Sequence, residues 1–147
     1  MSIFQSFDIN ASGMTAQRFR SDVISENIAN VKTTRTENGT PYRRQIVTFA
    51  EKDVTDFSNV LNKTRQAAIG NGVKVYSLEE DNETDFIKTY DPAHPDADQD
   101  GYVSYPNVNI VTEMTNLIDA SRSYEANATA FQASKGMMAT GLQLGQK

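Results

Sequence analysis

The sequence predicts an α+β fold in which long N- and C-terminal α-helices pack as an antiparallel coiled-coil-like pair, with a small β-rich module inserted between them. Three observations predict it. Residues 110–142 repeat with a seven-residue period, and residues 3–31 show a similar alternation of four and three, which is typical of helices that pack along a seam. Residues 35–106 instead carry strand patterns and turn signals. We therefore expect a terminal helical assembly domain of residues 1–34 and 107–147, and a β-rich module of residues 35–106.

The first helix is expected to span residues 2–30. Ser2 and Gln5 stand three positions apart, as in a capping box, so the helix can begin close to the first residue. Asn27 and Asn30 tolerate the left-handed backbone geometry in which many helices end, and a β-branched segment follows them. At about 1.5 Å per residue, this helix would be roughly 43 Å long.

The middle of the chain alternates strand patterns with turn signals. Three strands are expected, at residues 42–49, 73–76 and 85–90, because each run is rich in β-branched or aromatic residues. Residues 51–66 have near-helical apolar spacing interrupted by Asp, Ser and Asn, so a short helix and a loop stay equally open there. Three prolines within residues 91–106 exclude a helix or a central strand from that stretch, which forms an acidic loop.

The last helix is expected to begin after Asn107 or Asn109, either of which can cap it, and to extend to about Leu142. Apolar residues also lie off its main heptad rows, so its apolar sector is wider than a two-stranded coiled coil requires. This width implies more than one neighbouring helix. Periodicity alone leaves a self-contained helical bundle open as an alternative. The two rows are Ile110, Leu117, Tyr124, Phe131 and Met138, and Met114, Ser121, Ala128, Lys135 and Leu142.

Charge and composition exclude several classes of function. The net charge is −5, and residues 79–100 carry nine acidic residues against one lysine. Because no basic stripe is present, a nucleic-acid partner is not expected. No run of 18 apolar residues exists, so the chain is not expected to span a membrane, and no cleavable signal peptide is recognised at its N-terminus. The chain has no cysteine, which excludes disulfides and Cys-based metal sites.

Residues 96–101 resemble the opening of an EF-hand calcium loop, with Asp96, Asp98 and Asp100 at alternate positions. The twelfth position, which should be a bidentate Glu, falls on Asn107, so a polar turn is the preferred interpretation. A soluble calcium-binding interaction module that uses this loop is the alternative function. His94 is the only histidine, and no nucleophile, base or phosphate-binding glycine loop accompanies it. We therefore predict no enzyme activity, no catalytic or metal residues and no cofactor.

Two segments carry motifs that go beyond periodicity. Residues 25–33 read SENIANVKT, which resembles the S-x-N-(I/L)-A-N-x-x-T signature near the N-terminus of bacterial flagellar rod and hook proteins. Residues 122–127 read RSYEAN, which resembles the R-x-Y-E-A-N stretch of their C-terminal helix. Within this family, residues 90–97 (YDPAHPDA) with 101–103 (GYV) and 106–109 (PNVN) are similar to the proximal rod proteins.

The resemblance implies a structural subunit of the flagellar basal-body rod, the drive shaft that crosses the periplasm, which polymerises through its terminal helices to transmit torque. It implies a helical homo- or hetero-oligomer whose partners are further copies, other rod proteins, and components of the inner-membrane ring and export apparatus. Export through the flagellar type III system would need no cleaved signal peptide. The terminal helices of such proteins are largely disordered in the monomer and pair on assembly.

The seam positions and the two asparagines of the first motif are therefore the expected assembly interface. The predicted interface residues are Ile3, Phe7, Met14, Ile24, Asn27, Ile28, Asn30, Ile110, Met114, Leu117, Tyr124, Ala128, Phe131 and Met138.

Overall fold

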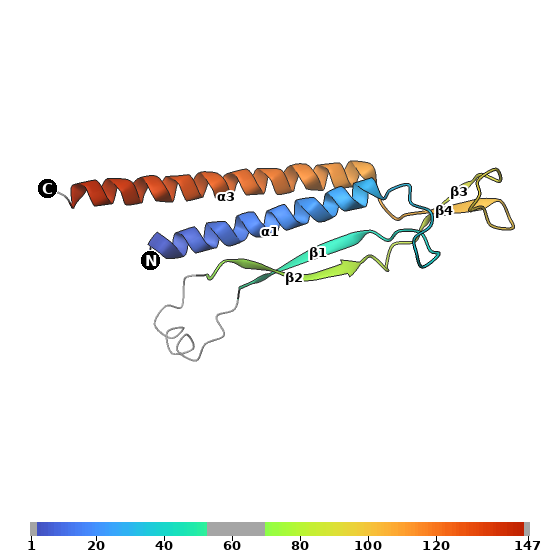
Figure 1. Cartoon of the computed structure of the whole chain (residues 1–147), viewed down its shortest axis with the longest axis horizontal. Coiled ribbons are helices and arrows are strands. Elements are labelled where there is room, and N and C mark those ends of the chain that lie inside the picture. Colours follow the sequence, from blue (N-terminus) through green and yellow to red (C-terminus); the bar gives the residue numbers. More distant parts are fainter. Residues whose placement is uncertain (1–2, 53–69, 146–147) are drawn as a thin grey trace, which may run out of the picture. The chain divides into compact units, whose positions relative to one another are not determined.

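A computed structural model describes residues 3–52 and 70–145 of the chain. The fold is α+β: two long terminal helices pack together, and short antiparallel strands come between them in the sequence (Figure 1). The elements are α1 (Ile3–Ala29), β1 (Gln45–Glu51), β2 (Val73–Glu80), β3 (Ile87–Tyr90), β4 (Tyr102–Tyr105) and α3 (Ile110–Leu144). The predicted fold class is confirmed.

The strands form two separate two-stranded sheets. The β3–β4 hairpin is antiparallel, with Ile87 opposite Tyr105 and Tyr90 opposite Tyr102. In the β1–β2 ribbon, the Lys52 N–H donates to the Gly72 carbonyl at 2.9 Å, and the Asp81 N–H donates to the Arg44 carbonyl at 2.8 Å. Because the residue number rises along one strand as it falls along the other, this ribbon is antiparallel as well.

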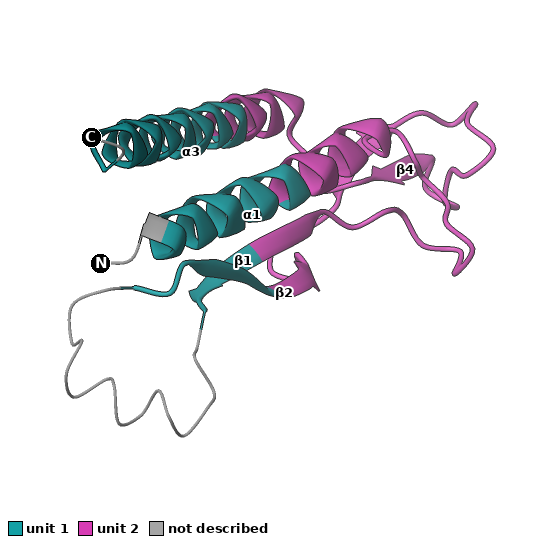
Figure 2. Cartoon of the chain, turned by 60° about the vertical axis from the view of Figure 1, so that its left-hand side comes forward, with its two compact units in different colours: residues 1–19, 48–76, 120–147 teal, residues 20–47, 77–119 magenta. Residues whose placement is uncertain are grey.

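The chain divides into two compact units (Figure 2). Unit 1 comprises residues 1–19, 48–76 and 120–147, and unit 2 comprises residues 20–47 and 77–119. In unit 1 the buried side chains of the described residues are small: Ala16, Ala120 and Ser134. In unit 2 they are larger and include buried polar groups: Val23, Ile24, Asn27, Val103, Asn107, Val108 and Glu113. Among the described residues, the large buried side chains therefore lie in unit 2.

Both predicted helices are confirmed almost to their ends. α1 is helical from Ile3, the first described residue, and ends at Ala29, while α3 extends two residues past Leu142. The side chain of Asn109 caps α3, because its Oδ1 accepts the Val111 N–H at 3.0 Å and the Thr112 N–H at 3.3 Å. The expected capping role of Ser2 lies outside the described residues.

Neither Asn27 nor Asn30 uses the left-handed geometry that an asparagine can tolerate at a helix end. Across residues 3–52 and 70–145, positive φ angles occur only at glycines. Asn30 instead assists the helix end with its side chain, donating from Nδ2 to the Glu26 carbonyl at 3.1 Å and accepting the Thr33 hydroxyl at 3.1 Å. Asn27 lies inside the helix and is 1% exposed, so its role is in packing.

The strands differ from expectation in extent and in number. β1 starts three residues late and β2 runs four residues past Tyr76, while β3 covers only the last part of the expected 85–90 strand. β4 was not expected, because prolines flank its sequence; it nevertheless forms on an edge, where a neighbouring proline disturbs no ladder. The ambiguous segment 51–66 falls mainly within residues 53–69, outside the described residues.

Within the described residues, neither helix combines the length and the apolarity needed to cross a membrane.

We expect hydrogen exchange to separate the two units in the isolated chain. Amides of residues 20–29 and 110–119 should exchange about tenfold or more slowly than those of residues 4–15 and 125–144, because only the first set lies over the larger buried side chains of unit 2. Exchange followed by mass spectrometry of peptides measures this difference. Equal protection along both helices would contradict it.

Candidate assembly interface

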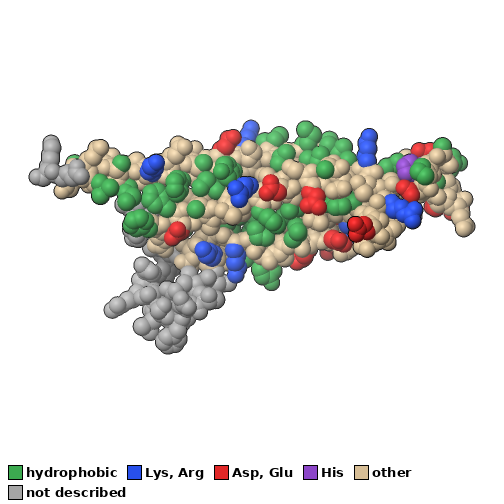
Figure 3. Space-filling model, viewed as in Figure 1, with side chains coloured by type: hydrophobic (Ala, Val, Ile, Leu, Met, Phe, Trp, Pro, Cys, Tyr) green, Lys and Arg blue, Asp and Glu red, His purple; other side chains and the backbone are tan. Residues whose placement is uncertain are grey.

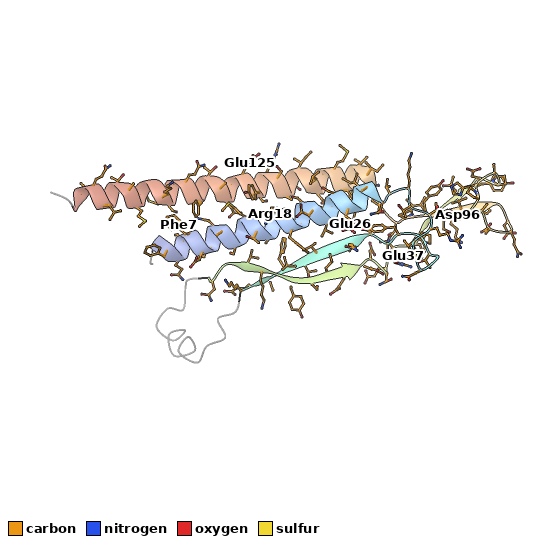
Figure 4. All side chains as sticks on the ribbon, viewed as in Figure 1. Phe7, Arg18, Glu26, Glu37, Asp96 and Glu125 are labelled. Carbon is orange, nitrogen blue, oxygen red and sulfur yellow. The ribbon has the colours of Figure 1, made fainter. Side chains whose placement is uncertain are left out.

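In unit 1 the two helices approach closely and run antiparallel. The rings of Phe7 and Phe131 lie with centroids 4.8 Å apart at an interplanar angle of 48°, and Phe7 lies between the helices (Figure 4). One to two turns further along α1, Gly13 faces Asn127, and a Cβ added at Gly13 would lie 2.9 Å from the Asn127 Oδ1. A larger residue at position 13 would therefore require the Asn127 side chain to move.

A second contact in unit 1 fixes the start of β2 against α1. The Ser12 hydroxyl donates to the Ile9 carbonyl at 2.7 Å and accepts the Val73 N–H at 3.1 Å. Gly72 has φ +91°, and a Cβ there would collide with the Ser12 side chain. Glycine is needed at position 72 on both counts, because the backbone is left-handed and the approach leaves no room.

The inward face of α3 is marked by four residues at seven-residue spacing. Glu113, Ala120 and Ser134 are buried, and Asn127 is half-buried. These residues are small or polar, whereas several large apolar residues of α3 point away from this row. Val111 is 74% exposed, Met114 54% and Ile118 52%, and hydrophobic side chains gather at the visible surface along the helices (Figure 3). In the single chain, α3 therefore turns a polar row inward and an apolar face outward.

In unit 2 the carboxylate of Glu113 is the centre of a polar network, which we define as Asn27, Tyr42, Arg44, Asp81, Asn107 and Glu113. Glu113 Oε1 accepts from Arg44 Nε at 2.9 Å and pairs with Nη2 at 2.8 Å, while Oε2 accepts from Asn27 Nδ2 at 3.2 Å. Glu113 is 1% exposed. A carboxylate buried so deeply is stable only with a cation and hydrogen-bond donors around it.

Asn27 links α1 to the start of β1. Its Oδ1 accepts the Gln45 N–H at 2.8 Å and the Tyr42 hydroxyl at 2.9 Å, and its Nδ2 donates to the Gln45 carbonyl at 2.9 Å. Together with the bond to Glu113, the amide uses all of its usual donor and acceptor positions. The Asn27 amide thus bonds to both the N–H and the carbonyl of Gln45, as a neighbouring strand would.

The side-chain amide of Asn107, which lies just before α3, likewise binds backbone groups of other segments. Its Oδ1 accepts the Arg44 N–H at 2.9 Å, and its Nδ2 donates to the carbonyls of Asp81 at 2.9 Å and Thr84 at 3.2 Å. The Asp81 carboxylate accepts the N–H groups of Glu83 and Thr84. These bonds, led by the one from the Thr84 backbone, hold the pKa of Asp81 below its usual 3.8.

Two carboxylates of the 96–101 loop are engaged by groups of the chain itself, Asp98 within the loop and Asp96 with the segment that follows α1. Asp98 Oδ1 accepts the N–H groups of Asp100 at 3.0 Å and Tyr102 at 2.8 Å. Asp96 accepts the Thr34 hydroxyl at 2.8 Å and lies 3.8 Å from the Arg35 guanidinium (Figure 4). In the part of the chain that the structure describes, no three acidic or histidine side chains come together as a metal site.

Comparison with known proteins accords with this architecture. The family "Flagella basal body rod protein" matches residues 7–35, and the family "Flagellar basal body rod FlgEFG protein C-terminal" matches residues 99–144. The flagellar basal-body rod protein FlgC of Bacillus subtilis is 46% identical over 152 residues, covering 99% of this chain and 100% of the relative. The chain belongs to the FlgC family of flagellar basal-body rod proteins. FlgC of Borreliella burgdorferi is 46% identical over 98% of both chains, and FlgC of Salmonella typhimurium is 38% identical over 99% of this chain and 100% of the relative. Membership supports a structural protein of the flagellar basal-body rod.

The two FlgC-family motifs coincide with the contacts described above. The SENIAN motif supplies Asn27, which completes the hydrogen bonding of Gln45 and Glu113. The RSYEAN motif ends in Asn127, which packs on Gly13 and donates to the Ser123 carbonyl at 2.8 Å. Each motif therefore has a packing role within one unit.

The predicted interface residues fall into three groups. Ile24 and Asn27 are buried within unit 2, and the structure brings Phe7 and Phe131 together in unit 1. Half-buried positions are Met14, Ile28, Asn30, Leu117, Ala128 and Met138, and exposed positions are Ile110, Met114 and Tyr124. The side chain of Ile3 is outside the description. Their role in contacts between subunits stays a prediction.

Sequence reasoning missed most of the polar network. Tyr42, Arg44, Asn107 and Glu113 were not predicted as contact residues, and heptad analysis ranked Met114 above its neighbour Glu113. A signal was present, because Glu113, Ala120, Asn127 and Ser134 are seven residues apart. Apolar periodicity overlooks such a row, since only one of its members is apolar.

We predict that Arg44→Leu lowers the free energy of unfolding by about 3 kcal/mol, because the Glu113 carboxylate would remain buried without its cation. Adding Glu113→Gln should recover part of the loss, since the unpaired charge is then gone. Urea unfolding followed by circular dichroism measures both values. Arg35→Leu is the matched control, because Arg35 is 71% exposed and its ion pair contributes little. An equal loss in the control would contradict this account.

We also predict that Tyr42 ionises last among the six tyrosines. Burial, followed by the negative charges of Glu26, Glu113 and Glu80, raises its pKa from 10.0 to about 12. A raised folded pKa stabilises the fold fully below pH 10.0, and this contribution is lost as the pH rises to about 12. Absorbance titration of tyrosinate should show one late step that Tyr42→Phe removes. A wild-type titration without this step would refute the assignment.

Proposed function

We propose that this chain is a structural subunit of the flagellar rod that polymerises through its terminal helices and transmits torque through the packed assembly. The observation that carries the proposal is the outward apolar face of the helices in a chain of the FlgC family. Large apolar side chains are exposed on both helices, including Phe4 at 65% on α1 and Val111, Met114 and Ile118 on α3.

These exposed side chains favour association. Burying one large apolar side chain stabilises by roughly 1.5–3 kcal/mol, and neither unit of the single chain covers them. Contiguous exposed apolar surface of this kind marks interaction sites. Copies of the chain and other rod proteins present helices of the same type, so they are the partners that we propose.

Torque transmission requires that the subunit resist deformation. In unit 2 the polar network joins α1, β1 and the first turns of α3, and its buried groups lose their hydrogen bonds if these elements shift. Leaving a buried polar group unsatisfied costs about 1–3 kcal/mol. The network therefore gives the subunit the resistance to shear that a drive shaft needs.

The proposal extends to location and route. We propose that the chain lies in the rod where it crosses the periplasm, next to components of the inner-membrane ring and the export apparatus, and that it leaves through the flagellar type III system without a cleaved signal peptide. The absence of cysteine supports passage as an unfolded chain, since no disulfide has to form afterwards.

We predict that Met114→Asp blocks rod assembly while the chain is still made and exported. Met114 is 54% exposed, so the substitution leaves the single-chain fold intact and places a charge on the face proposed to pack against a neighbour. Basal bodies examined by electron microscopy should lack a complete rod, and swimming should be lost.

Thr112→Asp is the control, because it adds the same charge at an exposed position that lies about 160° around the helix from Met114. Complete rods in the Met114→Asp strain would count against polymerisation through this face. Loss of rods in the control as well would show that any added charge is harmful and that the face is not specific.

A further inference from the structure

A pocket in unit 2 opens between α1, β1 and the start of α3. Val23, Ile24, Ile46 and Val47 supply apolar lining, and Arg20, Arg44, Gln45, Glu113 and Asn116 supply polar groups, with the Glu113 carboxylate already paired with Arg44. Val23 and Ile24 are each 5% exposed, so they form an apolar base of the pocket that is largely shielded from water. We call this the Arg20 pocket; Arg44 and Glu113 of the polar network form part of its lining, whereas Arg20 and Asn116 belong neither to that network nor to the helix seam.

The two guanidinium groups at this pocket are in different states. Arg44 is fully engaged by the Glu113 carboxylate and lies 3.8 Å from Asp81. Arg20 is half-buried, and within residues 3–52 and 70–145 it has no ion pair or hydrogen bond. The amide of Asn116, on the facing helix, likewise has no hydrogen bond among these described residues. A free guanidinium and a free amide beside an apolar floor suit a carboxylate carried on a short aliphatic stem.

The chain itself presents such groups in excess. Glu79, Glu80, Glu83 and Asp85 are all exposed, and none of their carboxylates forms an ion pair or hydrogen bond with another side chain in the part of the chain that the structure describes. Unit 2 has 14 acidic and six basic residues, so its carboxylates cannot all be neutralised within the unit. A contact that pairs one of them with Arg20 relieves part of this imbalance.

Glu83 is the most favourable of these groups. Its backbone N–H donates to Asp81, and the surrounding turn is held by the Thr84 bonds to Asp81 and by Asn107. The glutamate is thus displayed on a segment that is already ordered, which lowers the entropy lost on binding. Aspartate at the same place would lack the second methylene that reaches the apolar floor.

We infer that the Arg20 pocket binds the Glu83 side chain of a second copy of this chain. The glutamate carboxylate meets the Arg20 guanidinium and the Asn116 amide, and its methylene groups lie on Val23 and Ile24. Pocket and ligand are different surfaces, so each copy can receive one neighbour and offer itself to another, as a growing assembly requires. This inference rests on the proposed function, because it assumes that copies associate.

The test is a charge swap in the full chain, measured by sedimentation velocity at low ionic strength. Arg20→Glu and Glu83→Arg should each weaken self-association about tenfold, and the double variant should return to within about threefold of wild type. Arg18→Glu and Glu37→Arg are matched controls, because they make the same charge changes at exposed positions outside the pocket. Circular dichroism of each variant checks that the fold is retained.

Additive effects of the two substitutions, or equal effects in the controls, would overturn the inference. A wild-type chain that stays monomeric up to about 1 mM would also overturn it. The proposed function is judged separately: if Met114→Asp prevents rod formation and the charge pair shows no coupling, polymerisation through the helices stands and the pocket contact falls. If the charges are coupled and the Met114→Asp strain forms normal rods, the pocket contact stands and polymerisation through the helices falls.

Discussion

A buried carboxylate is the constraint on which unit 2 depends. Glu113 is removed from water between two helices and a strand, where an isolated negative charge would be prohibitively costly. Arg44 and Asn27 compensate it, and each of them is fixed in turn by backbone groups at the start of β1 or by Asp81. Because every member satisfies a group on another element, the arrangement of α1, β1 and α3 is specified as a set. A packed apolar contact would tolerate sliding that this set does not.

The close packing of the helices explains the unusual distribution of residues on α3. Small and polar side chains occupy the inward row, so the helices of unit 1 come close enough for Gly13 to meet Asn127. Several large apolar side chains, including Val111, Met114 and Ile118, are consequently left on the outward face. A self-sufficient bundle would place them the other way round. The alternative of a self-contained bundle, which periodicity left open, therefore fits the observed burial less well than a subunit that is completed by neighbours.

Sequence reasoning recovered the elements better than their contacts. Heptad spacing located both helices nearly to the residue, because many positions contribute to a long periodic signal. It could not decide which row of α3 faces α1, since the choice depends on pairing Glu113 with Arg44, 69 positions away. Motif resemblance identified Asn27 as important, but the fold uses its side-chain amide and not the left-handed backbone that asparagine tolerates. Edge strand β4 was missed, since flanking prolines concealed a short run that only its partner β3 makes regular.

The ribbon of β1 and β2 also brings two separated points of the chain together. The Lys52 N–H and the Gly72 carbonyl are joined at 2.9 Å, and Ser12 holds the neighbouring Val73 to α1. The two points at which the chain leaves and re-enters the ribbon therefore lie next to each other. Inserted sequence between these two points would cost only about 0.6 kcal/mol for each doubling of its length. Evolution, or an experimenter adding a peptide label, can lengthen the chain here and leave the helices as they are.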